Sequence, residues 1–422
     1  MTDDKMKICI DMLNSELMPA LGCTEPIAIA YASAKAREIL GEFPDKLNVY
    51  CSGNIIKNVK GVIVPTTVNM KGVDTSAVIG VVGGNPSKQL EVLSEVTKED
   101  VEKTRGLLGT EFCKVFLEKG VSNLYIKVEA IKDENKSIVE IVDGHTNIVT
   151  LMKNNEEIFK KNYSLNGESN NFKSIFTVKE LYEFANTVDI SKVHDVIKMQ
   201  IDYNMKIAEE GLTHKYGASV GNTILNYSEK NVANRAKAYV AAGSDARMGG
   251  CVLPVIINSG SGNQGMTVSI PVIVYANHLE VPEEKLYRAL IFSNLVALYQ
   301  KSGIGKLSAY CGAVSAACGS GAAIAYLYDE PFEVIGNTIK NVLGNVSGIV
   351  CDGAKASCAA KIASSVDAAI MGYNMAKTGH VFESGEGLIV QDLDKTVSNI
   401  CKVAKEGMKE TDVEILQLMI EE

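Results

Sequence analysis

Three cysteines near the end of the chain have the type and setting of metal ligands. Cys351 and Cys358 stand on either side of an Asp352-Gly353 break, just where a helix of small residues is predicted to begin, and Cys311 lies upstream. In an unbroken helix Cys351 and Cys358 would be roughly 10 Å apart along the axis, so we expect the break to fold Cys351 back over the helix start. Thiolates from different elements can hold an iron–sulfur cluster, and three of them leave one iron open for Lewis-acid chemistry.

Ordinary packing is the alternative for these thiols, because cysteine is among the most buried residue types. The ten cysteines form no CxxC motif, which argues against zinc ribbons and thioredoxin-like redox sites. The acidic, periodic N-terminal segment has no secretory pattern, so we expect a cytoplasmic protein with few disulfides. Cys318 is a rival ligand, although its place among alanines suits a packed thiol better.

A further thiol, Cys23, directly precedes Thr24-Glu25-Pro26 and a helix predicted to run to residue 40. Pro26 suits the first turn of a helix. Because the unpaired amides and the dipole at a helix start favour a thiolate, we take Cys23 as a candidate catalytic base or nucleophile. The alternative is a small residue that only seals the start of the helix.

Two polar segments could hold a substrate carboxylate. Asn263 and Gln264 lie in a glycine-rich loop at 259–265, and Asn54 and Lys57 lie in the segment 52–61. Glycines let a ligand approach the backbone, and amide side chains both donate and accept hydrogen bonds. An irregular turn between helices and a solvated turn are the alternatives. The five histidines are scattered, and only His214 lies in a loop with polar neighbours.

The elements that must position these residues divide the chain into two predicted domains of an α+β fold. Residues 1–40 and 177–422 are predicted to form a mainly helical catalytic domain, and residues 41–176 a smaller inserted α+β domain. Predicted strands within the insertion are LNVYCSG, GVIVPTT, AVIGVVGG, NLYIKVEAI, SIVEIVDG and TNIVTLMK. The pieces near 124–131 and 137–142, separated by KDENK, are predicted to form a hairpin. Helices are predicted at Leu90–Val96, Lys98–Leu108 and Gly109–Lys119, and a polar connector at Asn154–Lys173.

Composition excludes several classes of function. A chain of 422 residues with a net charge of −9 is unlike a nucleic-acid-binding protein, which is usually basic. The long weakly polar stretch Leu307–Leu327 is rich in Ala, Gly and Ser, so it is predicted to be a buried helix and not a membrane span. We therefore expect a protein that acts on a small molecule, without nucleic-acid or membrane partners. The oligomeric state stays open, with a homodimer among the options.

Five segments in this order resemble the L-cysteine desulfidase family, which includes uncharacterised serine dehydratase-alpha-like members. They are LGCTEPIAIA, SGNIIKNVKGVIVP, GSGNQGMTVSIPV, CGAVSAACGSG and GNVSGIVCDGAKASC, and they span nearly the whole chain. The chain is more distantly similar to the iron–sulfur L-serine dehydratases. In those enzymes a Ser-His-Thr-type segment occupies the place of Cys23 and its neighbours. The residue at this position is therefore expected to differ between enzymes that prefer cysteine and enzymes that prefer serine. The shorter spacing between Cys351 and Cys358 favours the cysteine branch.

The resemblance implies β-elimination of L-cysteine to hydrogen sulfide, pyruvate and ammonia. It implies an oxygen-sensitive [4Fe–4S] cluster held by Cys311, Cys351 and Cys358, no pyridoxal phosphate, and Cys23 at the position of the base. The roles of Asn54, Lys57, Asn263 and Gln264 are not settled by it. L-serine dehydration and a non-catalytic iron–sulfur or sulfur-sensing protein are the alternatives, as is a cluster-free protein whose thiols only pack.

Overall fold

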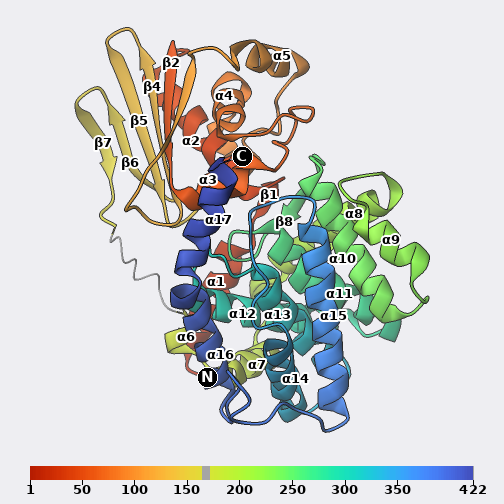
Figure 1. Ribbon diagram of the computed structural model, residues 1–422. Coiled ribbons are helices and arrows are strands. Elements are labelled where there is room, and N and C mark those ends of the chain that lie inside the picture. The colour runs from red at the N-terminus through yellow and green to blue at the C-terminus, as the bar shows by residue number, and fades with distance from the viewer. Residues whose placement is uncertain (164–171, 422) are drawn as a thin grey trace.

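The computed structural model describes residues 1–163 and 172–421, and its fold is α+β and mainly helical, as the sequence predicts (Figure 1). The α-helices are α1 (Asp3–Glu16), α2 (Thr24–Leu40), α3 (Gly53–Lys60), α4 (Val73–Gly83), α5 (Lys98–Leu107), α6 (Phe172–Ile175), α7 (Val178–Thr187), α8 (His194–Thr213), α9 (Val220–Tyr227), α10 (Val232–Met248), α11 (Gly262–Leu279), α12 (Glu283–Ile304), α13 (Gly312–Leu327), α14 (Phe332–Asn345), α15 (Cys358–Lys377), α16 (Leu393–Lys402) and α17 (Lys409–Glu421). The strands are β1 (Pro19–Leu21), β2 (Lys46–Cys51), β3 (Cys113–Leu117), β4 (Tyr125–Lys132), β5 (Asn135–Val142), β6 (Ile148–Lys153), β7 (Glu156–Lys160) and β8 (Pro254–Ile256). Short 3₁₀ turns lie at Pro86–Glu91 and Ile190–Lys192, and a π turn at Val403–Gly407.

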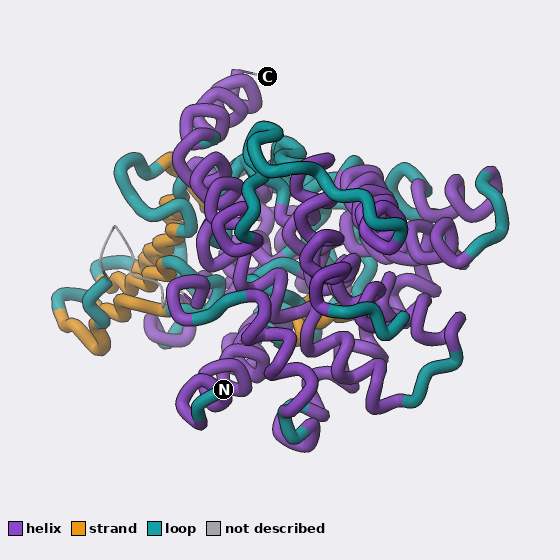
Figure 2. Tube along the Cα trace, turned by 90° about the horizontal axis from the view of Figure 1, so that it is seen from below, coloured by secondary structure: helices purple, strands orange, loops and turns teal. Residues whose placement is uncertain are grey.

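Six strands form one sheet in the order β3-β2-β4-β5-β6-β7. The β2–β3 pair is parallel and the other pairs are antiparallel. The predicted hairpin is confirmed, because β4 and β5 pair from Tyr125 opposite Val142 to Lys132 opposite Asn135. Figure 2 shows these strands together at one side of the molecule, with helices over the rest.

Helix α2 packs against β4, β5 and α4, so its body lies on the sheet while its first residues reach the helical part of the molecule. The segment AVIGVVGG, predicted as a strand, belongs instead to α4. A short apolar run fits a buried helix as well as a strand. The segment folds as a helix here, and a Cβ on Gly80 would meet the carbonyl oxygen of Ala30 of α2 at 2.3 Å. That close approach lets α4 pack tightly on α2.

Four other local predictions were wrong. The helix predicted at Leu90–Val96 is the end of the 3₁₀ turn at Pro86–Glu91 followed by an irregular turn. GVIVPTT forms no regular strand; it contributes only an isolated bridge from Ile63 to Lys71. The helix predicted at Gly109–Lys119 is strand β3, bounded by Gly109 and Gly120 with positive φ of 80° and 75°; pairing with β2 gives this edge segment its conformation. Of the predicted connector, part is strand β7, and residues 164–171 lie outside the described residues.

Helix α13 is the centre of the helical part and packs against α11, α12, α14 and α15. Its small residues allow this: a Cβ on Gly319 would meet the carbonyl oxygen of Ser293 on α12 at 2.4 Å. The prediction of a buried helix near Leu307–Leu327 is confirmed by the burial of α13. No helix in the described ranges combines the length and the apolar character needed to cross a membrane.

Two further contacts join the sheet region to the helical part. Strands β1 and β8 form a separate antiparallel pair just before α2 and α11. The C-terminal helix α17 runs alongside α3, which follows the first strand of the large sheet (Figure 1). The first of these contacts lies next to two helix starts that contribute to the site described next.

Candidate active site

One cavity of about 100 Å³ lies where several helices begin. Cys23 is the N-cap of α2, Ser261 the N-cap of α11 and Cys311 the N-cap of α13, while Cys358 is the first residue of α15; all four line the cavity. Helix starts present unpaired amides and a partial positive charge, so they favour bound anions. Four such starts converge on this cavity and favour an anionic occupant.

The three predicted ligands, Cys311, Cys351 and Cys358, all line this cavity. Tyr310 and Val350 form an isolated antiparallel bridge that brings the first two thiols together. The amide of Cys311 donates to Ile349 over 2.9 Å, and the amide of Cys351 to Ala309 over 2.6 Å. Cys358 lies nearby on α15 and donates to the carbonyl oxygen of Gly353 over 3.7 Å.

These thiols fit the donor set of an iron–sulfur cluster. They are free, come from three elements and face one cavity. In the part of the chain that the structure describes, no group of three or more His, Cys, Asp or Glu side chains is placed so that it could hold a metal ion as it stands. Cys311 lowers the pKa of Cys351 to about 6 through a hydrogen bond, helped by the charges of Lys57 and Lys361, while burial opposes the shift. The hydrogen bond favours the thiolate of Cys351, the form that binds metals, and raises the pKa of its partner Cys311.

The loop that carries Cys351 is held by charged neighbours. The carboxylate of Asp352 pairs with Lys355 over 2.6 Å and also with Lys361. Gly353 has φ of +96°, and a Cβ there would meet the carbonyl oxygen of Lys57 on α3 at 2.4 Å. The Asp-Gly break predicted from the sequence thus does turn the chain, and the turn packs directly on α3.

Cys23, the predicted base, lines the same cavity and lies at the helix start where the sequence predicts it. Its thiol donates to Oε2 of Glu25 over 3.0 Å. Burial and the negative charge of Glu25 raise the pKa of Cys23 well above its ordinary value, although Arg247 acts in the opposite sense. This direction is opposite to the one that the helix-dipole argument predicts, because burial outweighs the dipole.

Glu25 and His145 are cavity residues that the sequence analysis did not single out. Nε2 of His145 lies 3.7 Å from Oε1 of Glu25, and Asn58 donates to the same oxygen over 3.3 Å. Burial favours the neutral acid, but His145 and the Cys23 thiol outweigh it and lower the pKa of Glu25 to about 2. His145 lies in the turn between β5 and β6 and brings the sheet to the cavity. The sequence signal that could have identified His145 is its position directly after the predicted strand SIVEIVDG. His214, the histidine that the sequence analysis considered, is exposed at the surface.

Among the residues that the structure describes, buried polar atoms without a hydrogen-bond partner gather around this cavity. In most proteins such atoms are few, and a group of them is typical of a place where water, an ion or a ligand binds. The atoms at the cavity are Oδ1 of Asn58, Nε2 of His145, Nε and Nη2 of Arg247, Oδ1 of Asn263, Oε1 of Gln264 and the hydroxyl of Tyr310. The cavity is therefore prepared for a polar occupant.

The structure separates the four predicted substrate-binding residues into two pairs. Asn263 and Gln264 line the cavity at the start of α11. Asn54 and Lys57 are not among its lining residues. The ammonium of Lys57 is buried, pairs with Asp412 of α17 and donates to the carbonyl oxygen of Cys351 over 3.3 Å. Lys57 thus supports the cysteine loop from behind.

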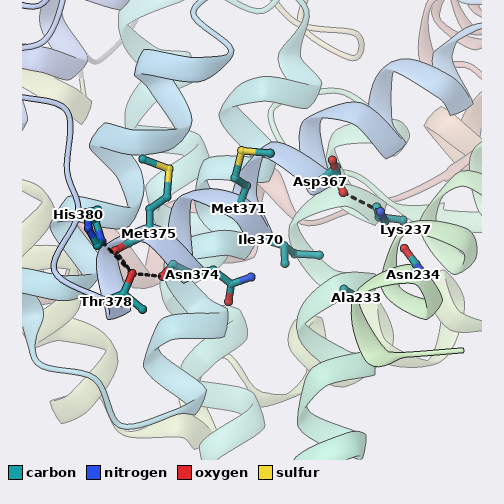
Figure 3. A pocket seen from close by; sticks show the side chains of 10 residues that line it. All are labelled: Ala233, Asn234, Lys237, Asp367, Ile370, Met371, Asn374, Met375, Thr378 and His380. Atoms are coloured by element: carbon teal, nitrogen blue, oxygen red, sulfur yellow. Dashed lines mark hydrogen bonds and ion pairs between the residues drawn. The ribbon is translucent and has the colours of Figure 1, made fainter. Parts of the chain in front are cut away.

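A second hollow, of about 550 Å³, lies between α10 and α15 (Figure 3). Its charged and polar side chains largely satisfy each other: Lys237 pairs with Asp367 over 2.6 Å, and the Thr378 hydroxyl lies 3.1 Å from Nδ1 of His380. None of the residues that line it keeps a buried polar atom without a partner in the described ranges. The cysteine-lined cavity is therefore the stronger candidate.

Comparison with known proteins finds one matching family model and several similar proteins. The family model described as serine dehydratase alpha chain matches residues 87–417. A UPF0597 protein of Lachnoclostridium phytofermentans is 55% identical over 98% of this chain and 99% of its own. A UPF0597 protein of Finegoldia magna is 50% identical over 99% of this chain and 100% of its own. A UPF0597 protein of Treponema denticola is 47% identical over 98% of this chain and 97% of its own.

Proposed function

The chain belongs to the serine dehydratase alpha chain family, and from this premise we propose that it is an iron–sulfur-dependent lyase that eliminates hydrogen sulfide from L-cysteine. The products would be hydrogen sulfide, pyruvate and ammonia. The observation that carries the proposal is that Cys311, Cys351 and Cys358 line one cavity together with Cys23. Three ligands and a candidate proton acceptor are then within reach of one small substrate.

Cys311, Cys351 and Cys358 would hold the cluster. When bound there, a cluster with one open iron supplies a Lewis acid that makes the substrate sulfur a better leaving group. The helix starts of α2, α11, α13 and α15 favour its negative charge, and the lysines around Asp352 hold the loop in place.

Cys23 and Glu25 act as a unit in proton transfer. At rest the proton stays on Sγ of Cys23 and points at Oε2 of Glu25, 3.0 Å away. For Sγ to take the α-proton of the substrate, its own proton must first pass to Oε2. The raised pKa of Cys23 and the lowered pKa of Glu25 make this transfer unfavourable while the cavity is empty. An anion bound beside Glu25 would raise the pKa of its carboxyl group and reduce this cost. Asn58 and His145 contact the other oxygen of this carboxylate and hold its orientation. General-base help of this kind typically contributes a factor of about 10² to 10⁴ in rate.

Elimination of water from L-serine is the second candidate, because the matching family model carries the name of serine dehydratase. Both reactions form pyruvate, but only the first releases sulfide. The same cavity residues would serve either substrate, so the choice between them must be measured.

The test uses protein purified and reconstituted with iron and sulfide without oxygen. We expect L-cysteine to give equal amounts of sulfide and pyruvate, faster than L-serine gives pyruvate. Cys351→Ala should lose iron and activity together. Cys318→Ala is the matched control, because Cys318 is a fully buried thiol of α13 outside the cavity, and it should keep both.

Three results would contradict the proposal. Full activity without iron would remove the cluster from the reaction. Faster turnover of L-serine would support the dehydratase assignment instead. Iron-loaded protein that turns over neither amino acid would support a non-catalytic iron–sulfur or sulfur-sensing protein.

A further inference from the structure

We propose that Arg247 binds the α-carboxylate of the substrate, an inference that rests on the proposed function. Arg247 lies in the last turn of α10 and lines the cavity. Its side chain is 2% exposed, yet Nε and Nη2 have no hydrogen-bond partner in the described chain. A buried charge without a partner is costly, so proteins normally pair it. A carboxylate matches the planar fork of a guanidinium through two parallel hydrogen bonds.

The neighbouring helix start is shaped around this guanidinium. A Cβ on Gly262, the first residue of α11, would meet Nε of Arg247 at 2.4 Å and Cζ at 2.8 Å. Glycine at this position therefore makes room for the guanidinium beside the first turn of α11. The positive end of α11 and the guanidinium lie together, which strengthens the attraction for an anion.

Acceptors for the ammonium group of an amino acid lie beside the guanidinium. Asn263 and Gln264 follow Gly262, and their buried oxygens Oδ1 and Oε1 have no partner among the described residues. A Cβ on Gly312 would meet Cδ of Gln264 at 2.4 Å, so this amide lies against the start of α13, next to Cys311. An α-amino acid could place its carboxylate on Arg247 and its ammonium toward these oxygens, with its side chain toward the thiols.

A different role for Arg247 is to balance the charge of the cysteine ligands, since its charge also lies near Cys23 and Cys358. The two roles predict different results. Loss of a charge-balancing residue would lower iron content or change the absorption of the cluster. Loss of a carboxylate receptor would weaken substrate binding and leave the cluster unchanged.

The experiment measures binding of L-alanine and of ethylamine to reconstituted protein by calorimetry. L-alanine has the carboxylate and ammonium but no leaving group, and ethylamine lacks the carboxylate. In Arg247→Gln we expect L-alanine to bind roughly 10- to 100-fold more weakly, the size expected for lost hydrogen bonds between charged groups. Ethylamine binding, iron content and cluster absorption should match those of the wild type, and Arg247→Lys should recover part of the L-alanine affinity.

Arg235→Gln is the control, because Arg235 lies on the same helix outside the cavity and donates to the carbonyl oxygen of Val274 over 3.5 Å. Unchanged L-alanine binding in Arg247→Gln would overturn the inference, and so would a parallel loss of iron. The two proposals can fail separately. Arg247-dependent L-alanine binding without elimination would refute only the lyase, whereas elimination with an unchanged KM in Arg247→Gln would refute only the carboxylate site.

Discussion

Tyr310 and Val350 pair as an isolated antiparallel bridge, and the residue after each is a cysteine that faces the cavity. This bridge joins the start of α13 to the loop before α15. It brings Cys311 and Cys351 together although the whole of α13 and α14 separates them in the chain. Backbone hydrogen bonds therefore set the spacing of the two thiols. The contribution of the residues that hold the loop of Cys351 can be tested by substitution.

Gly353→Ala should weaken the cluster site. Its φ of +96° disfavours any side chain, and a Cβ would also meet the carbonyl oxygen of Lys57. We expect a loss of about 1–3 kcal/mol in the free energy of unfolding and a lower iron content after reconstitution. Gly385→Ala is the matched control, since Gly385 has φ of +100° but open space around it; it should lose some stability and keep its iron. Equal iron content in both variants would contradict this account.

Asp412→Asn should destabilise the protein because it leaves the ammonium of Lys57 buried without its partner. Removing one member of a buried ion pair typically costs about 3 kcal/mol or more. The double variant Lys57→Met with Asp412→Leu should recover much of this loss, which urea unfolding can measure. In Glu111→Gln the exposed pair with Lys114 is broken instead, and no measurable change is expected. If the double variant were no more stable than Asp412→Asn, a buried unpaired charge would not be the cause.

Glu25→Gln should reduce the turnover of L-cysteine by about 10²- to 10⁴-fold. The amide can still contact Cys23 but cannot take its proton. Iron content and cluster absorption should stay unchanged, because Glu25 is not a proposed ligand. The control is Glu140→Gln, a sheet residue that accepts from Tyr125 and Thr150 outside the cavity. Undiminished turnover in Glu25→Gln would remove this carboxylate from the proton path.

Asp245 should make the stability of the protein depend on pH. Burial raises its pKa from 3.8 to about 6, although the amides of Gly221 and Val220 oppose the shift. Between these values the unfolded chain releases the proton while the folded chain keeps it. Stability from this group is therefore complete below pH 3.8 and falls as the pH rises to about 6.

Asp245→Asn should remove this fall. Compared with the wild type, the variant should gain roughly 3 kcal/mol in the free energy of unfolding between about pH 4 and about pH 7, as urea titrations can measure. Asp189→Asn should differ from the wild type by a nearly constant amount across this range, because hydrogen bonds from Ser191 lower the pKa of Asp189 and its contribution therefore changes only below about pH 3.8. A constant difference between Asp245→Asn and the wild type across this range would contradict the raised pKa.

Local sequence patterns correctly predicted the helical character of the chain, the β4–β5 hairpin and the helix that begins directly after Cys23, because each of these depends on residues that are close in the sequence. They failed where tertiary contacts decide the structure. The apolar run of α4 packs on α2 where Gly80 closely approaches Ala30, and β3 pairs with β2. Neither contact can be read from the local period of the sequence.

The same division holds for the site. Residue type and helix-start context indicated the cysteines and the amides of Asn263 and Gln264, since glycine loops and caps are local signals. Only the folded chain brings His145 from the sheet and Arg247 from the end of α10 into the same cavity, and only it turns Lys57 toward Asp412. The physical reason is burial: a charged side chain acquires its role from what surrounds it in space, and those neighbours come from distant parts of the sequence.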